Sequence, residues 1–223
     1  MEPSEVIRFM LEEQVRHIVQ KDGPCFEAEL SDLHALIDHP METICGPVTD
    51  GVVEFNEISA YDDKKSKILG PFEEFLKTVK GARGIRDEAM MIADELFTNG
   101  AKNGWDPPRL TKDSKPVRPG VVEFFARAGN GRLVLGCRDT YGQLGFDQVL
   151  LRIRRCFEEG IAQSISQGQG GAGIGSFMVF NSCISYYASV EKGKRTVVCV
   201  ALPLGTKQGE TSSLPKNIHL VAI

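Results

Sequence analysis

The sequence predicts an α/β protein: a two-layer sandwich in which helices cover a mixed, mostly antiparallel sheet, with a helical extension at the N-terminus. Three observations predict this class. From residue 51 the patterns follow the order strand, helix, helix, strand, strand, helix, glycine-rich loop, helix, strand, strand. Short turn sequences at 129–131 and 191–194 join two pairs of strands, as in antiparallel hairpins. The first 50 residues precede this order and are strongly acidic.

The N-terminal extension, residues 1–50, begins with an amphipathic helical pattern. Ser4 is suited to cap this helix, and the run at 21–24 ends it. Its apolar residues recur at helical spacing: Val6, Ile7, Met10, Leu11, Val15, Ile18 and Val19. Residues 25–50 hold two prolines and only short apolar pieces, so there we expect irregular structure with one short strand at most.

The body, residues 51–205, carries the other elements, and a polar tail that we expect to be loose, residues 206–223, follows it. Gly70 and Pro71 introduce the first helix of the body, and a longer helix runs between Gly84 and Gly100. The expected strands are 52–58, 121–128, 132–138, 184–190 and 196–202. The first helix of the body is expected at 72–80, and two more helices, after the longer one, at 147–159 and 177–183.

The composition excludes several classes of protein. The chain has 223 residues, 42% hydrophobic and 25% charged, which suits one sizeable core and not a disordered, collagen-like or small disulfide-stapled protein. Charges interrupt the apolar runs of the N-terminus, so we expect neither a signal peptide nor a membrane span. Six cysteines without a C-x-x-C pair argue against zinc and redox motifs, and favour a reducing, cytoplasmic location.

The charge is unevenly distributed along the chain. Residues 1–63 hold 3 Lys/Arg against 15 Asp/Glu, a net charge of −12, whereas residues 64–223 carry a net +8. The basic residues are scattered and lack the interleaved aromatic residues of a base-stacking surface, which argues against nucleic acid. A polyphosphate ligand explains the basic body better. The opposite charges also favour packing of the extension against the body, or against the same surface of a second copy.

Glu95 and Asn99 lie four residues apart on the long predicted helix, so both side chains project from one face. Lys102 and Asn103 extend this polar ridge. Amide and carboxylate oxygens suit a hard cation, so the ridge is consistent with a helix that lines a Mg²⁺-phosphate cavity. The same spacing also fits a solvated helix face.

Two further patterns follow in the chain. Asp139 ends an apolar strand just before Gly142, which also fits ordinary turn chemistry. Five glycines then occupy eight positions at 168–175, directly before an apolar helix. The free N–H groups of such a loop and the helix dipole form an anion site suited to phosphates, although a linker is the alternative. The run contains no P-loop and closes no parallel dinucleotide unit.

In order and spacing, these clusters resemble the GHKL (histidine kinase-like) ATPase superfamily of gyrase, heat-shock chaperone, histidine kinase and mismatch-repair ATPases, over about residues 51–203. The resemblance implies the histidine kinase-like (Bergerat) fold, ATP and Mg²⁺ as ligands, and a mobile lid over 143–170. It further implies the residue roles that follow. Asp139 accepts from the adenine amino group, Asn99 binds Mg²⁺, Glu95 is catalytic, and the nucleotide also meets Gly142, Gly171, Gly173, Gly175, Lys102, Asn103 and Thr196. The chain departs from the family's Asp-x-Gly-x-Gly at Tyr141, which leaves the shape of the adenine pocket open.

Among these families the chain most resembles stand-alone bacterial anti-sigma factor serine kinases, because it lacks a phosphoacceptor-like histidine box and room for a transducer domain. The resemblance implies an ATP-dependent serine/threonine kinase or ATPase whose partner is an antagonist or a sigma factor-like protein. Two alternatives stay open: a non-catalytic adenine-nucleotide sensor that switches a protein interface, and a nucleic-acid-binding regulator based only on the +8 body. The sensor would not need the Glu95 carboxylate.

Overall fold

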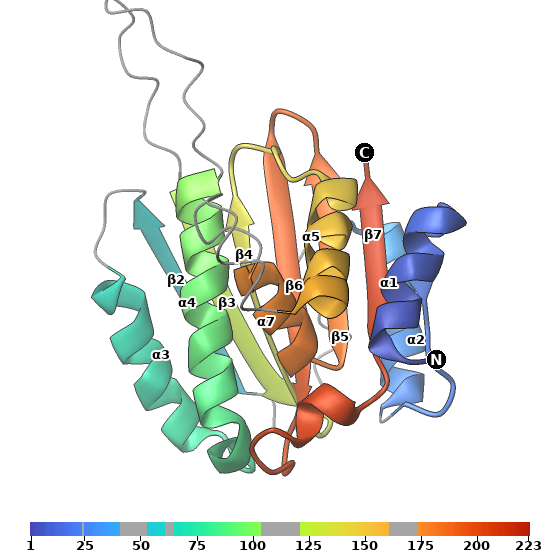
Figure 1. Cartoon of the computed structure of the whole chain (residues 1–223). Coiled ribbons are helices and arrows are strands. Elements are labelled where there is room, and N and C mark those ends of the chain that lie inside the picture. The colour runs from blue at the N-terminus through green and yellow to red at the C-terminus, as the bar shows by residue number, and fades with distance from the viewer. Residues whose placement is uncertain (24, 41–52, 61–64, 104–120, 161–173) are drawn as a thin grey trace, which may run out of the picture.

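The computed structural model describes residues 1–23, 25–40, 53–60, 65–103, 121–160 and 174–223. Over these residues the chain is an α/β protein with one seven-stranded mixed sheet and six α-helices (Figure 1). The predicted combination of helices and a mostly antiparallel sheet is confirmed at this level. Among the described helices, none combines the length and apolar character that crossing a bilayer requires.

The sheet has the strand order β1-β7-β5-β6-β4-β3-β2, in which β5 and β7 are parallel and the other neighbours antiparallel. Its strands are β1 (His17–Ile18), β2 (Val53–Ala60), β3 (Val121–Gly129), β4 (Arg132–Asp139), β5 (Ser185–Glu191), β6 (Arg195–Pro203) and β7 (Asn217–Ala222). Both predicted hairpins, β3–β4 and β5–β6, are formed. The first turns through Asn130 (φ 52°) and Gly131 (φ 74°), the two left-handed residues that a tight hairpin turn requires.

Five helices cover one face of the sheet and the sixth covers the other (Figure 1). The first group is α1 (Pro3–Glu12), α3 (Ser66–Thr78), α4 (Arg86–Asn103), α5 (Phe146–Glu159) and α7 (Ile174–Ser182); α2 (Phe26–Asp38) lies opposite. Strand alternation sorts the side chains between the two faces. On β4, Leu133 and Leu135 join the core beneath the five helices, whereas Val134 packs in the cluster that contains Leu36 of α2.

The N-terminal extension packs on the sheet, but its first helix is shorter than predicted. It ends at Glu12 because Gln14 adopts a left-handed conformation (φ 56°) and residues 17–18 pair with β7. Its buried residues, Val6, Ile7 and Met10, belong to the main core, and α1 lies against α5. The apolar residues beyond Glu12 therefore serve an edge strand and its flanks rather than a longer helix.

The helix α2 occupies residues for which we predicted irregular structure, and that prediction was wrong. The buried residues of α2 are Glu29, Asp32 and Leu36, which lie on one helical face. Two of these three buried residues are acidic, so the pattern of apolar residues did not indicate a helix here. The segment 41–52 lies outside the described residues.

The prediction of a loose C-terminal tail was also wrong. Residues 217–222 form β7, between β1 and β5. Ile218 and Leu220 are buried in the helix-covered core, while Asn217 and His219 alternate to the opposite face and are buried there. Because the tail that holds β7 is mostly polar, its composition concealed this strand of the sheet.

The helix α3 begins at Ser66, before the Gly70–Pro71 pair that we expected to introduce it. Ile68 and Phe72, four residues apart, are both buried on its inner face, and Pro71 is exposed. Burial of the extra turn therefore outweighs the hydrogen bond that the proline cannot donate. The longer helix α4 packs its predicted apolar stripe, including Ile92 and Leu96, into the core.

Candidate functional site

Glu95, Asn99 and Gly175 meet on the face of the sheet that the five helices α1, α3, α4, α5 and α7 cover. Asn99 Nδ2 donates a hydrogen bond to Glu95 Oε1 (2.8 Å). Gly175, in the first described turn of α7, approaches the same carboxylate so closely that a Cβ added there would lie 1.8 Å from Glu95 Oε1. Two patterns that are 80 residues apart in the sequence are therefore in contact, and with the Glu95 side chain in this position only glycine fits at position 175.

The core packing of α4 explains why Glu95 and Asn99 face this contact. Ala89, Ile92, Ala93, Leu96 and Phe97 are buried and fix one side of the helix. Glu95 and Asn99 occupy the flank of that buried stripe and are half-buried. The preceding residue, Asp94, pairs with Lys65 Nζ (2.6 Å), which leaves two adjacent carboxylates with different partners. The orientation of α4 about its axis therefore places Glu95, and not Asp94, against α7.

Asp139 lies where β4 ends and is 9% exposed. Its Oδ1 accepts hydrogen bonds from the backbone N–H groups of Tyr141 (2.9 Å) and Gly142 (3.2 Å). Burial raises the pKa of Asp139 above its usual value, although these N–H groups and Thr196 act in the opposite direction. Because Oδ1 already shapes the turn, a ligand amine would have to be recognised by Oδ2.

Gly142 has a backbone reason to be glycine. Its φ is +63°, and an added Cβ would lie 2.2 Å from the carbonyl oxygen of Glu191. The N–H of Gly193 also donates to the carbonyl of Gly142 (3.2 Å), so the turn after β4 is fastened to the β5–β6 turn. Gly142, which the resemblance implies as a nucleotide contact, therefore packs two turns together, and Tyr141 beside it is half-buried.

The last turns of α4 and the Asp139 turn lie at one edge of the face that five helices cover. Gly100 follows Asn99, and a Cβ on it would lie 3.2 Å from Cγ1 of Val122. Val122 is the register partner of Asp139, which pairs in turn with Thr196 on β6. The end of α4, the end of β4 and the start of β6 therefore share the upper edge of the sheet in Figure 1.

Four predicted site residues add nothing to this geometry. Gly171 and Gly173 lie outside the described residues, and so do the side chains of Lys102 and Asn103 in the last turn of α4. Thr196 is buried on the same face as Asp139. The structure thus brings together Glu95, Asn99 and Gly175, and separately Asp139, Gly142 and Thr196.

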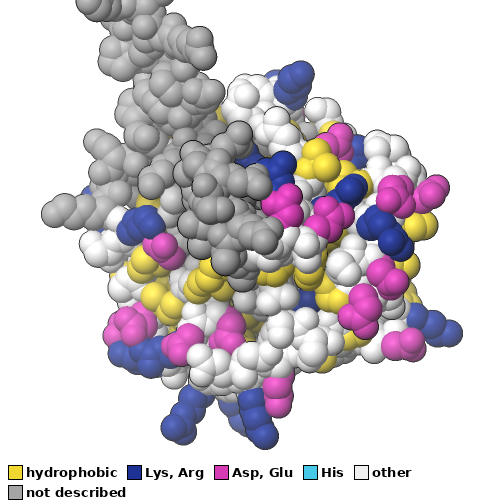
Figure 2. Space-filling model, in the orientation of Figure 1, with side chains coloured by type: hydrophobic (Ala, Val, Ile, Leu, Met, Phe, Trp, Pro, Cys, Tyr) yellow, Lys and Arg dark blue, Asp and Glu magenta, His cyan; other side chains and the backbone are white. Residues whose placement is uncertain are grey.

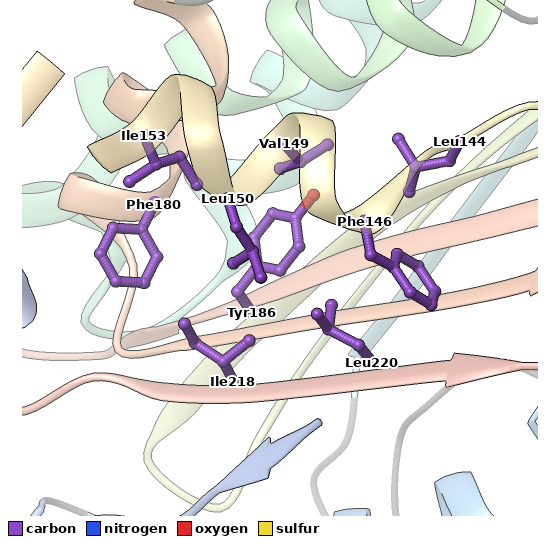
Figure 3. A pocket seen from close by; sticks show the side chains of 9 residues that line it. All are labelled: Leu144, Phe146, Val149, Leu150, Ile153, Phe180, Tyr186, Ile218 and Leu220. Carbon is purple, nitrogen blue, oxygen red and sulfur yellow. The ribbon is translucent and has the colours of Figure 1, made fainter. Parts of the chain in front are cut away.

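The first half of the expected lid is a packed helix. Residues 146–159 form α5, and Figure 3 shows its Val149, Leu150 and Ile153 facing residues of β5 and β7 across a cavity of about 10 Å³. This volume is at the lower limit for one water molecule. The helix is therefore part of the core, and residues 161–173 of the expected lid lie outside the described residues.

The residues of this site fit a Mg²⁺ ion that is held mainly by phosphates. Because Asn99 directs Nδ2 toward Glu95, its Oδ1 lies on the other side of the amide. Mg²⁺ retains several waters and takes one or two protein oxygens when it accompanies a nucleotide. Among the described residues there is no group of three His, Cys, Asp or Glu side chains that could hold a metal alone.

A second group of functional-type side chains was not predicted. We call it the buried acidic cluster: Glu29, Asp32, Arg132, Ser185, Tyr187 and His219, on the face covered by α2. Ser185 Oγ donates to Glu29 Oε2 (2.5 Å), and His219 Nε2 lies 2.9 Å from Glu29 Oε1. Arg132 Nη2 pairs with Asp32 Oδ2 (2.7 Å). Two features of the sequence could have indicated this cluster. Arg132 begins an otherwise apolar strand, and Glu29, Asp32 and Leu36 have the spacing of one helical face.

No model of a known protein family matches the chain, and a search of curated proteins finds no match. The assignment of function therefore depends on the residues and geometry of the site.

Proposed function

We propose that this chain is a Mg-ATP-binding regulatory protein of the GHKL type that phosphorylates or sequesters a protein partner, as the anti-sigma factor serine/threonine kinases do. The observation that carries the proposal is the contact of Glu95 with Asn99 and Gly175, on the same face of the sheet as Asp139. Residues from all three sequence patterns of that superfamily therefore lie on one face, in two separate groups. A Bergerat-type fold is part of the proposal, supported by the mixed sheet and the element order.

Asp139 would recognise adenine. A buried carboxylate accepts a hydrogen bond from the exocyclic amine of adenine, whereas guanine presents an acceptor at that position. Oδ1 is held by the two N–H groups of the turn, so the carboxylate has a fixed orientation. Thr196, opposite Asp139 in the register, would flank the base. This arrangement favours ATP and ADP over GTP.

Glu95 and Asn99 would act at the phosphates. ATP with Mg²⁺ supplies an electrophilic γ-phosphorus and a leaving group. The hydroxyl oxygen of a partner serine or threonine forms a bond to that phosphorus, the bond to the β–γ bridging oxygen breaks, and ADP leaves. Glu95 orients the hydroxyl and accepts its proton, while Asn99 offers Oδ1 to the cation. Gly175 places backbone, without a side chain, beside the Glu95 carboxylate.

The partner in this proposal is a protein, an antagonist or a sigma factor-like molecule, and a second copy of the chain is a further candidate. Nucleic acid is disfavoured because basic and acidic side chains are intermingled on the face shown in Figure 2. On α5, for example, Arg154 pairs with Glu158 (2.7 Å). The five cysteines within the described residues are all free thiols, which agrees with a reducing, cytoplasmic location.

A second candidate function is the non-catalytic adenine-nucleotide sensor. It is favoured by the position of α5, which follows the Asp139 turn and packs against α1 of the N-terminal extension. A change at the nucleotide edge could therefore alter the extension without any phosphoryl transfer.

One substitution separates the kinase from the sensor. Glu95→Gln retains the size and the contact with Asn99 but removes the base, so phosphoryl transfer to co-purified partner protein should fall at least 100-fold while ATP affinity changes less than threefold. Asp94→Asn, on the neighbouring carboxylate that pairs with Lys65, is the matched control and should transfer normally. Wild-type protein that binds ATP and transfers no phosphate would favour the sensor.

A further inference from the structure

The segment between β6 and β7 joins two helices at their ends far from the candidate site. We call residues 205–216 the C-terminal clasp; it includes the short 3₁₀ helix η2 (Glu210–Ser213). In Figure 1 the clasp lies at the lower edge of the molecule, where α4 begins and α7 ends. Glu95, Asn99 and Gly175 lie farther along the same two helices, away from the clasp.

At the start of α4, the clasp is held by carboxylates and close backbone packing. The N–H of Gly209 donates to Glu88 Oε1 (2.8 Å), and Gln208 Nε2 donates to Asp87 Oδ2 (3.1 Å). A Cβ on Gly84, just before α4, would lie 2.1 Å from the carbonyl oxygen of Thr206. The clasp therefore fits the beginning of α4 with little freedom.

At the end of α7, a buried lysine makes the connection. Lys216 is 1% exposed, and its Nζ donates to the carbonyls of Asn181 (2.9 Å), Cys183 (2.6 Å) and Thr211 (2.8 Å). An ammonium group has three N–H donors, so each finds an acceptor. A cation also complements the negative C-terminal end of a helix. Lys216 thus ties the last turn of α7 to the clasp.

The two helices transmit these connections to the site. Glu88 and Glu95 are seven residues apart on α4, about two turns, and Asn181 and Gly175 are six residues apart on α7. Over two turns a helix behaves as a rigid rod, so fixing one end sets the position of the other. The Gly175 backbone lies directly against the Glu95 carboxylate, so a rotation of either helix would change this contact.

We propose that the C-terminal clasp positions α4 against α7 and so sets the Glu95–Gly175 contact, with Lys216 as a positioning residue for the candidate site. The inference rests on the proposed function for its effect on chemistry, but not for its effect on the helices. Lys216 contacts none of the predicted site residues in the described structure.

Hydrogen exchange of the nucleotide-free protein tests the effect on the helices. Lys216→Met removes all three donors while keeping an unbranched side chain, and the amides of α7 should exchange at least tenfold faster, with those of α3 unchanged. Lys207→Met, an exposed lysine of the same clasp, should leave α7 as in the wild type. Unchanged α7 protection in folded Lys216→Met would overturn the proposal whatever the protein does with ATP. If Lys216→Met fails to fold, Glu88→Ala is the second variant, because it removes the acceptor of the Gly209 N–H at the start of α4. It should make the amides of α4 and α7 exchange faster, with those of α3 unchanged.

Steady-state kinetics tests the effect on chemistry. Lys216→Met should lower kcat of phosphoryl transfer at least tenfold, with KM for ATP within twofold, because Asp139 and Thr196 lie at the ends of β4 and β6 that are far from the clasp. Asp32→Asn, on the opposite face of the sheet, controls for general loss of stability and should leave kcat unchanged. An equal loss of kcat in both variants would contradict a positioning role. If α7 exchanges faster in Lys216→Met but the wild type transfers no phosphate, the positioning role of the clasp is supported and only the kinase proposal is contradicted.

Discussion

The carboxylate of Glu95 lies against the α-carbon of Gly175, so that a methyl group on Gly175 would lie 1.8 Å from Glu95 Oε1 and 1.9 Å from Cδ. The glycine belongs to the end of the glycine-rich run and the glutamate to a helix 80 residues earlier. Their contact gives Gly175 a packing reason to be glycine, while the other glycines of the run lie outside the described residues.

Gly175→Ala should therefore displace Glu95 and abolish the chemistry that depends on it. Overpacking a buried position destabilises a protein by roughly 1–3 kcal/mol, so the variant should remain folded at 25 °C. We expect phosphoryl transfer to fall at least 100-fold, measured with a radiolabelled phosphate donor. Gly70→Ala is the control, because no atom lies within 4 Å of its added Cβ and alanine favours the α3 helix. Full activity in Gly175→Ala would contradict the role of this contact.

Asp139→Asn should weaken ATP binding at least tenfold, since it replaces a charged acceptor by an amide, a difference of roughly 1.5–3 kcal/mol for a charge-assisted hydrogen bond. The turn should lose some stability as well, because Oδ1 accepts two backbone N–H groups. Isothermal titration with ATP checks the affinity. Equal affinity in the variant and the wild type would mean that Asp139 only shapes the turn.

If Asp139 binds adenine as proposed, its raised pKa should give ATP binding a pH dependence. Ionised Asp139 is the acceptor, and its proton returns at a higher pH than for an ordinary carboxyl group because burial disfavours the charge. We therefore expect affinity for ATP to decrease on acidification before exposed carboxyl groups titrate, and this decrease to vanish in Asp139→Asn. Titrations between pH 7.5 and 4.5 test this, with the loss of the pH dependence in the variant as the decisive result.

The buried acidic cluster should be the most sensitive position of the α2 face. Glu29 and Asp32 are 0% exposed, so Arg132→Met would leave buried carboxylates without their guanidinium partner. Removing one partner of a buried ion pair costs about 3–5 kcal/mol of unfolding free energy. Arg127→Met breaks the pair with the exposed Glu54 and should cost at most about 1 kcal/mol. Urea unfolding compares the two, and similar losses would contradict the account of the cluster.

His17 makes the β1 edge sensitive to acid. Burial and the neighbouring His219, whose ring lies 5.7 Å away, lower the pKa of His17 below its ordinary value of 6.5. As the pH falls through 6.5, the unfolded chain gains this proton before the folded one, so the free energy of unfolding decreases. We expect His17→Gln to lose less stability than the wild type between pH 7.5 and 5.5 in urea titrations. A steeper loss in the variant would reverse the sign we assign.

The sequence was most informative where apolar periodicity and turn chemistry coincided. The α4 stripe and the Asn130–Gly131 hairpin follow local rules and were predicted nearly to their ends. The helix α2 and strand β7 were missed for one physical reason. On the α2-covered side of the sheet they bury Glu29, Asp32, Asn217 and His219, whose partners lie in other elements, so apolar periodicity does not reveal these buried faces.

For the candidate site, spacing along the helix was enough to pair Glu95 with Asn99. The contact of Glu95 with Gly175 could not be predicted from the sequence, because it depends on how α7 packs against α4. The structural role of Gly142 also required the fold, since the β5–β6 turn that packs on it is 50 residues away in sequence.

The central claim, that this edge of the sheet binds Mg-ATP through Asp139, is tested most directly by the thermal midpoint of the wild type and Asp139→Asn with ATP, ADP or GTP, each with and without Mg²⁺. Ligand at ~100 times its Kd adds about 2.7 kcal/mol, which in a chain of this length shifts the midpoint by roughly 5–10 °C. We predict that shift for wild type with ATP and Mg²⁺, a smaller one with GTP, and about half of the wild-type shift or less in Asp139→Asn at the same ATP concentration. No shift with millimolar ATP and Mg²⁺, or equal shifts in the two proteins, would contradict the claim.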